Sequence, residues 1–451
     1  MIETALDWAH LSFVATVLCL STFGQCVVLA FHALFPFPGV LRWLHRRSRP
    51  LQSLFRPNLG LNDLSRQSAR ELAEAAGFRV EDHQAITADG FVLVLHRLVD
   101  PDKVNGANGS SNDSSNGHGT GNREALRPAV LLMHGLMQDS ESLLCGGRDH
   151  ALGLRLAAAG FDVFLGNARG NRYSHKAGHL RLSPVSSNAY WNFSIDELAR
   201  YDTPAMFDLV LKVSGQSKLC YIGFSQGTAQ AFAAFSSNPD LLEKVQLFVA
   251  LSPAVRANHL SKSLLLSLVQ ANLRFINLLF GRRRMLPVAL TWQRMMSREF
   301  FVATIDAAVS YLFSWNVSQI SAERKLEVYP HIYSYSSVKC VVHWFQMMYS
   351  GRLSMFADGP AKHYLPVTYD VARVSCPVAI VYGGRDHLVD VESLIEMLPN
   401  VVMTIREEEY EHLDTMWADS AKVTVFPRVE ALVRQVCQGV ENRDARCTID
   451  A

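Results

Sequence analysis

Charged side chains are missing from one long stretch near the amino terminus. Between Asp7 and Arg42 the chain contains no Asp, Glu, Lys or Arg. Residues 11–35, LSFVATVLCLSTFGQCVVLAFHALF, form an apolar run. At about 1.5 Å per helical residue, this run is long enough to cross a hydrocarbon layer of roughly 30 Å. We therefore expect residues 1–50 to form a membrane anchor with a basic flank.

Basic residues are also missing before this apolar run. Glu3 and Asp7 precede it, and no small-residue cleavage site follows, which argues against a removable signal peptide. Four arginines follow it, at positions 42, 46, 47 and 49. Basic residues favour the cytoplasmic side of a membrane, so the sequence predicts that the bulk of the chain faces the cytoplasm.

The helix-breaking sequence FPFPG at 35–39 leaves a second geometry open for the anchor. The apolar run could form a hairpin or lie in the plane of one leaflet, which would suit the surface of a lipid droplet. The sequence does not choose between a spanning helix and a hairpin.

Strong charge and paired cysteine motifs are absent as well. A formal net charge of +1 gives no global electrostatic argument for nucleic acid as a partner. The eight cysteines show no CxxC pairs or regular spacing, which argues against a zinc cluster or a disulfide-dense secreted scaffold.

Apolar side chains are nearly absent from residues 101–124, which are dominated by Gly, Ser and Asn. Such a segment gains too little from burial to offset the entropy lost on ordering. It lies between two strand-like runs, 91–99 and 128–135, so we interpret it as a flexible loop within one domain.

The pattern G-x-S-x-G occurs once at the junction of a strand-like run and a helix-compatible run. In YIGFSQGTAQAFAAF, Ser225 lies between Gly223 and Gly227. A nucleophilic serine at such a corner adopts a strained backbone, and the glycines let the strand and helix approach closely. Because the pentapeptide also occurs by chance, the hypothesis needs a base and an acid elsewhere in the chain.

Both partners follow Ser225 in the chain. Asp386 comes after the apolar strand-like run CPVAIVYGG, and His412 lies in a polar turn before the last helical stretch. The order serine, acid, histidine is the one that α/β-hydrolases use. His387 remains an alternative base, and Asp390 or Asp414 an alternative acid.

Acyl transfer also requires donors for the developing oxyanion, usually two backbone N–H groups. Gln226 follows the candidate nucleophile, and Leu136 follows a strand-like run that ends in His134-Gly135. We predict the N–H groups of Leu136 and Gln226 as the two donors. His134 precedes the acid in the chain, so we interpret it as a structural hydrogen-bonding residue.

Several separated motifs resemble the acid lipase family of α/β-hydrolases, which includes gastric and lysosomal acid lipases. They are HGLMQDS at 134–140, AAAGFDVFLGNARGNRYS, YWNFSIDELARYDTPAMFDLVL, GFSQGTAQAFAAFSSNPDL and YGGRDHLVD with YEHLD, in that order. The similarity covers about residues 70–255 and 370–420. It implies a mostly parallel sheet, the site residues already predicted and neither a metal nor an organic cofactor. It also implies a loop-fixing role for Asn167, Arg169 and Asn171.

Two sequence features differ from those of the secreted members. In both features the chain resembles the fungal membrane-associated steryl ester hydrolases of the same family. One is the retained apolar anchor, and the other is Phe224 before the serine, where secreted enzymes have His. This resemblance implies a protein of the endoplasmic reticulum or lipid droplet with its catalytic domain in the cytoplasm.

The segment between the two hydrolase-like parts is rich in Leu, Phe, Met, Trp and Tyr. We expect a helical cap over the site, and a long apolar substrate, because burying each methylene contributes roughly 0.8 kcal/mol. The basic stretch 259–287 suits either a lipid surface or a core-facing helix with a solvated end.

The sequence therefore predicts an α/β-hydrolase that cleaves steryl esters at a membrane or lipid-droplet surface. Triacylglycerol hydrolysis and a catalytically silent lipid-surface scaffold are the alternatives. The expected parts are the anchor at 1–50, the first core part at 65–254, the cap at 255–370, the second core part at 371–438 and a tail at 439–451.

Overall fold

A computed structural model describes residues 67–101, 127–176, 187–255, 281–286, 289, 293, 297–357 and 366–437. The predicted anchor at 1–50, nearly all of the predicted loop at 101–124 and the tail at 439–451 lie outside these ranges. Among the described helices, none combines the length and the apolarity that crossing a bilayer requires.

One eight-stranded sheet runs through the described part of the chain, in the order β1-β2-β4-β3-β5-β6-β7-β8. Strand β2 pairs antiparallel with β1 and β4, and every later neighbour is parallel. The strands are β1 (Arg79–Ile86), β2 (Val92–Val99), β3 (Ala129–Met133), β4 (Asp162–Leu165), β5 (Leu219–Phe224), β6 (Val245–Leu251), β7 (Val378–Gly383) and β8 (Val401–Glu407). The predicted mostly parallel sheet is confirmed.

Continuous apolar runs form the central strands because both faces of the sheet are covered. Every residue of β3, β5 and β7 is buried. On one face, Tyr221 of β5 packs against Phe207 and Phe235, with ring centroids 5.9 and 5.7 Å away. Phe224, whose side chain points to the other face, packs against Trp417 at 5.3 Å.

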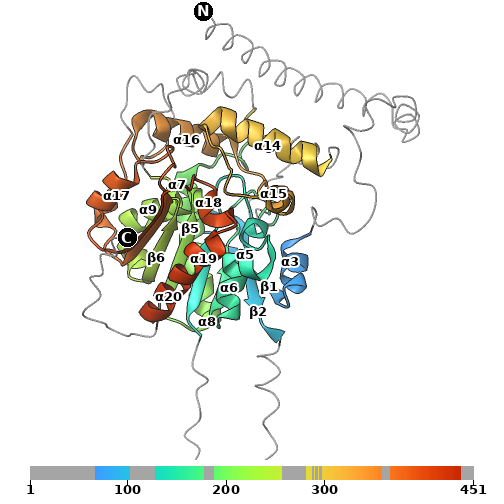
Figure 1. The fold of residues 1–451 in the computed structure, drawn as a ribbon. Coiled ribbons are helices and arrows are strands. Elements are labelled where there is room, and N and C mark those ends of the chain that lie inside the picture. The colour runs from blue at the N-terminus through green and yellow to red at the C-terminus, as the bar shows by residue number, and fades with distance from the viewer. Residues whose placement is uncertain are drawn as a thin grey trace, which may run out of the picture.

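The helices surround this sheet and rise above it (Figure 1). The core helices are α3 (Ala69–Ala75), α5 (Gly147–His150), α6 (Leu152–Ala158), α7 (Ile195–Glu197), α8 (Thr203–Ser214), α9 (Gln226–Ser237), α10 (Pro239–Leu242), α17 (Val391–Met397), α18 (Asp414–Trp417), α19 (Ala421–Thr424) and α20 (Phe426–Cys437). Short 3-10 turns are η2 (Ser140–Leu143), η4 (Tyr329–His331) and η5 (Val371–Arg373), and η3 (Leu198–Asp202) is a π-helix.

Between β6 and β7 the chain leaves the sheet and builds helices on top of it. These are α14 (Arg298–Phe313), α15 (Ala322–Val328) and α16 (Val338–Ser350). In Figure 1, α14 and α16 both lie at the top of the view, above the sheet. Each begins with a serine whose side chain accepts a backbone N–H, and each ends in a left-handed residue.

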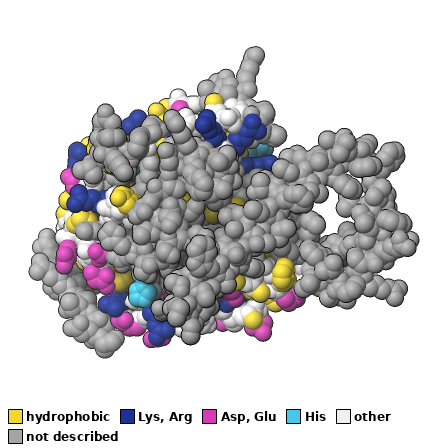
Figure 2. Space-filling model, turned by 90° about the horizontal axis from the view of Figure 1, so that it is seen from above, with side chains coloured by type: hydrophobic (Ala, Val, Ile, Leu, Met, Phe, Trp, Pro, Cys, Tyr) yellow, Lys and Arg dark blue, Asp and Glu magenta, His cyan; other side chains and the backbone are white. Residues whose placement is uncertain are grey.

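Three arginines at the end of the predicted basic stretch fall within the described residues. Arg283 donates to Asn188 at 2.8 Å, and the Arg284 guanidinium lies 5.0 Å from the centre of the Tyr335 ring. Arg282 is exposed. Two of the three cations therefore contact the protein's own surface. Seen from above, described basic, acidic and hydrophobic side chains are mixed around the margin of this face (Figure 2).

Candidate active site

Ser225 sits at a sharp corner between β5 and α9. Its backbone has φ 50° and ψ −113°, a conformation that non-glycine residues rarely adopt. Its N–H donates to the carbonyl of Leu251 at 3.0 Å, which fixes the corner to strand β6. The strained turn presents the hydroxyl at the carboxyl end of the sheet.

The two glycines of the motif are required by close backbone contacts. A Cβ added to Gly223 would lie 2.8 Å from the carbonyl of Gly227. A Cβ added to Gly227 would lie 2.6 Å from the carbonyl oxygen of Met133 in β3. Both distances are shorter than any side-chain carbon tolerates, so the G-x-S-x-G spacing follows from how the strand and helix pack.

The structure brings three of the predicted site residues into one hydrogen-bonded chain. His412 Nε2 lies 2.8 Å from Ser225 Oγ, and His412 Nδ1 lies 2.7 Å from Asp386 Oδ2. Asp386 follows β7, and His412 lies between β8 and α18. The Asp386 side chain has no exposed surface and that of His412 is only 3% exposed, so both are shielded from competing water.

The alternative acids and the alternative base do not take part in this series of hydrogen bonds. Asp390 begins helix α17, where it accepts the N–H and the hydroxyl of Ser393. Asp414 accepts the N–H of Glu411 at 2.7 Å, and burial raises the pKa of its carboxyl to about 7. His387 is exposed beside Asp386.

The loop that carries Leu136 is held by its neighbours on both sides. The N–H of Gly135 donates to the side chain of Gln138 at 2.9 Å, and Met137 has a left-handed backbone with φ 54°. The N–H of Ser334, in the cap segment between η4 and α16, donates to the carbonyl of Met137. Gln226 begins α9 directly after Ser225.

His134 uses both ring nitrogens to shape this loop. Its Nδ1 donates to the carbonyl of Gly135 at 2.8 Å, and its Nε2 accepts the N–H of Ala168 at 3.2 Å. Complete burial lowers the pKa of His134 and so favours the neutral ring that these two bonds require. Because both ring nitrogens form hydrogen bonds within the protein, these contacts support the predicted structural role of His134.

The GNARGN segment links the early strands to the core. Arg169, 1% exposed, contacts the carboxylates of Asp202 and Asp89, with its Nε 2.7 Å from Asp202. Asn167 accepts the N–H of Ser140 at 3.0 Å and an N–H of Asn171 at the same distance. These bonds hold the loop in place and lie outside the chain formed by Ser225, His412 and Asp386.

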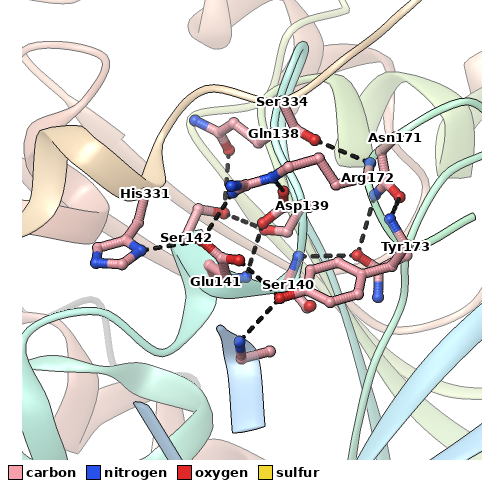
Figure 3. Close-up of polar contacts among 12 residues, drawn as sticks. Gln138, Asp139, Ser140, Glu141, Ser142, Asn171, Arg172, Tyr173, His331 and Ser334 are labelled. Atoms are coloured by element: carbon pink, nitrogen blue, oxygen red, sulfur yellow. Dashed lines mark hydrogen bonds and ion pairs between the residues drawn. The ribbon is translucent and has the colours of Figure 1, made fainter. Parts of the chain in front are cut away.

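A buried polar cluster joins the loop after Leu136 to the cap segment that carries His331 and Ser334 (Figure 3). Glu141 accepts from Arg172 at 2.7 Å, Tyr173 at 2.6 Å and His331 at 3.0 Å. Burial alone would raise the pKa of Glu141, but the bonds from His331 and Arg172 hold it below its usual value. Burial raises the pKa of neighbouring Asp139, which accepts from Arg172 at 2.9 Å.

Two cap tryptophans contact the site, and sequence reasoning missed both. Trp344 of α16 donates from its indole nitrogen to the side chain of Gln226 at 2.9 Å. The ring of Trp315 stacks on the imidazole of His412, with centroids 5.1 Å apart. Because 118 and 97 residues separate these pairs in the chain, no local pattern could have revealed them.

Within the described residues, no group of three or more His, Cys, Asp or Glu side chains is placed to hold a metal ion. The arrangement contains a serine hydroxyl, an imidazole, a buried carboxyl group and backbone N–H groups. Together these groups can carry out acyl transfer.

Comparison with known proteins agrees with this geometry. Residues 128–419 match the model of the alpha/beta hydrolase fold, and residues 69–147 match the partial alpha/beta-hydrolase lipase region. A probable lipase of Schizosaccharomyces pombe is 37% identical over 83% of this chain and 78% of its own. The chain belongs to the acid lipase family of α/β-hydrolases.

Mammalian members of the acid lipase family are similar over nearly the same span. Human lipase member K and bovine gastric triacylglycerol lipase are each 32% identical, and each match covers 80% of this chain and 89% of the relative. This acid lipase family member is therefore a carboxylic ester hydrolase.

Proposed function

We propose that this protein hydrolyses lipid esters through an acyl-enzyme on Ser225. Its hydroxyl attacks the ester carbonyl while His412 Nε2 takes the proton, and Asp386 holds the imidazole and stabilises the imidazolium. The N–H groups of Leu136 and Gln226 stabilise the oxyanion. The alcohol leaves with the proton from His412, and water then releases the fatty acid by the same steps.

The observation that carries this proposal is the continuous hydrogen-bonded chain from Ser225 through His412 to Asp386, with distances of 2.8 and 2.7 Å. A serine hydroxyl becomes nucleophilic at neutral pH only beside a positioned base, and the base needs a carboxylate to hold its tautomer. Both conditions are met here, and the side chains of Asp386 and His412 are shielded from water.

Replacing Ser225 with Ala removes the nucleophile. We expect ester hydrolysis to fall at least about a thousandfold, as removal of a triad member does, with the folded structure retained. A fluorophosphonate should label the native protein at Ser225 and leave S225A unlabelled. Unchanged turnover in a folded S225A protein would refute the assignment, and absence of labelling in the native protein would favour a silent scaffold.

For the substrate, we propose steryl esters, with triacylglycerol as the second candidate. The apolar segment above the site and the resemblance to fungal steryl ester hydrolases support the first. The 32% identity with a gastric triacylglycerol lipase supports the second. To decide between them, purified protein is given cholesteryl oleate and trioleoylglycerol in the same droplets. The ester with the larger kcat/KM is the preferred substrate.

We also propose that residues 1–50 anchor the protein to the endoplasmic reticulum or a lipid droplet, with the catalytic domain in the cytoplasm. The support is the uncharged run between Asp7 and Arg42 and the arginines that follow it. Protease protection in sealed microsomes tests the orientation, because a lumenal domain would survive external protease.

A further inference from the structure

The indole of Trp315 lies flat against the imidazole of His412. The two ring planes differ by only 8° and their centroids are 5.1 Å apart. Phe313 in turn stacks on Trp315 at 4.5 Å and 24°. Phe224 also packs against His412, tilted by 46° at 5.7 Å. Aromatic contacts from both the cap and the core therefore restrain the imidazole.

The cap segment that carries Trp315 is fastened to the loop that carries His412. The N–H groups of Asn316 and Val317 both donate to one carboxylate oxygen of Glu411, the second at 3.0 Å. Ser314 and Val317 have left-handed backbones, with φ 62° and 40°. Such strain persists only where the surroundings enforce it, and here the Glu411 carboxylate provides that restraint.

The chemistry of the reaction gives this stack a role. In each half-reaction the imidazole takes a proton and becomes a cation, and it must stay aligned between the serine and the leaving oxygen. The face of an indole attracts a cation within about 6 Å, most strongly where water is excluded. Trp315 is 6% exposed. Its attraction therefore grows as the imidazolium forms, which lowers the barrier rather than strengthening ground-state binding.

We propose that Trp315 is a positioning residue for His412, which holds the imidazole in line and stabilises its protonated form during catalysis. This inference rests on the proposed roles of Ser225 and His412. It makes the cap part of the catalytic centre as well as a cover for the substrate.

The test uses the full chain and a short soluble ester, p-nitrophenyl butyrate, which reaches little of an apolar substrate site. W315L removes the aromatic ring that stacks on His412, whereas W315F keeps an aromatic ring at this position. F301L is the matched control, because Phe301 is a cap aromatic of similar burial, 7% exposed, in α14. For W315L we expect kcat to fall about tenfold to thirtyfold with KM within about twofold of the native value.

W315F should recover most of this kcat, and F301L should keep kcat within about twofold even if it unfolds at a lower temperature. An unchanged kcat in W315L with a raised KM would make Trp315 a wall of the substrate site and overturn the proposal. An equal loss of kcat in F301L would also overturn it, since general cap integrity would explain the effect.

Failure of the proposed function gives a different result. Fluorophosphonate labelling at a serine other than Ser225 would refute both the triad and the role of Trp315. Labelling at Ser225 together with a fully active W315L would refute only the role of Trp315.

A second observation, independent of the proposed function, concerns two cysteines at the opposite end of β5 from Ser225. Cys220 of β5 and Cys437 of α20 have sulfur atoms 3.4 Å apart. Cys220 is buried, and Cys437 is partly exposed. The hydrogen bond from Cys220 lowers the pKa of Cys437, which favours the thiolate on the less buried of the two cysteines.

We propose that Cys220 and Cys437 are a redox-active pair that a small disulfide compound, such as oxidised glutathione, converts to an intramolecular disulfide. The Cys437 thiolate attacks the small disulfide and releases one thiolate. The Cys220 sulfur, after giving up its proton, then attacks the mixed disulfide and releases the second. The two protein thiols are oxidised and one small disulfide is reduced to two thiols, so atoms and electrons balance.

To test this, the full chain is incubated with oxidised glutathione, alkylated under denaturing conditions and digested with trypsin without reduction. The expected product joins peptide 219–244 to peptide 435–443, and it is absent from C437S. A stable glutathione adduct on Cys437 with Cys220 still alkylated would overturn the proposal. Preferential pairing of Cys437 with Cys447 would overturn it as well.

Discussion

Two glycine Cα atoms set how closely β3, β5 and α9 approach one another at Ser225. Gly223 faces the backbone of Gly227, and Gly227 faces the carbonyl of Met133. The Ser225 hydroxyl is therefore positioned by contacts among backbone atoms, which cannot relieve a clash by changing rotamer.

Gly227→Ala should destabilise the protein and lower its activity, because the added carbon would lie 2.6 Å from a backbone oxygen in the sheet. We expect a loss of about 3 kcal/mol in the free energy of unfolding, the upper end of the usual cost of overpacking, because backbone atoms must move. Urea titration measures it. Gly77→Ala is the control: its added carbon has open space but a φ of 86°, so about 1–2 kcal/mol is expected.

Asp414 should make stability depend on pH. Its folded pKa is raised to about 7 by burial, above the ordinary value of 3.8. The folded protein holds this proton more tightly, so the contribution is fully present below about pH 4 and is lost as pH rises through about 7. We expect Asp414→Asn to reduce the loss of stability between pH 5 and 8 by on the order of 3 kcal/mol.

Thermal unfolding of both proteins at the two pH values measures this effect. Asp208→Asn, which alters a side chain that is 65% exposed, provides the comparison and should leave the pH dependence unchanged. A D414N protein with the native pH dependence would show that another group is responsible.

At the scale of the elements, helix α16 connects the cap to the residues proposed as oxyanion donors. Its N-terminal Ser337 accepts the N–H of Cys340 and donates to the carbonyl of Phe193 in the core. Further along the helix, Trp344 reaches Gln226 at 2.9 Å. The loop before α16 supplies Ser334, which bonds to Met137 beside Leu136. One cap element thus contacts the elements that carry both proposed donors.

Trp344→Phe should lower kcat several-fold, because the buried side chain of Gln226 loses its donor and the start of α9 becomes less constrained. A buried acceptor left without a partner costs about 1–3 kcal/mol, so the unfolding temperature should fall as well. Kinetics on p-nitrophenyl butyrate and thermal unfolding measure the two effects. Phe345→Leu, at the neighbouring and less buried position, should change neither by more than a small amount.

At the scale of the whole molecule, the described parts on either side of the cap form one sheet. β6 and β7 pair directly, although the cap segment separates them in sequence. This pairing brings the loops of Asp386 and His412 beside Ser225.

Leu20→Arg together with Val27→Arg, in the full chain, should release the protein from membranes. Each arginine near the middle of a spanning helix costs about 2.5–3.5 kcal/mol on insertion. Alkaline carbonate extraction of membranes measures this, with Leu20→Ile and Val27→Ile as the conservative control. A protein that stays in the pellet with both arginines would show that another surface holds it there.

The strands near the site and the strand-to-helix corner at Ser225 could be predicted from the sequence alone. Continuous apolar runs indicate buried strands, and a serine between two glycines indicates a strained corner, because both patterns depend only on residues that are close in sequence. The order of Ser225, Asp386 and His412 followed from the same local signals. Local pattern and chain order were therefore enough to name the candidate nucleophile, acid and base.

Only the tertiary structure decided which of these residues meet and what surrounds them. The stack of Trp315 on His412, the bond from Trp344 to Gln226 and the proximity of Cys220 and Cys437 all join residues far apart in the chain. Such contacts depend on how strands and cap helices pack in three dimensions. The sequence by itself determined the chemistry of the reacting groups, and packing determined their alignment.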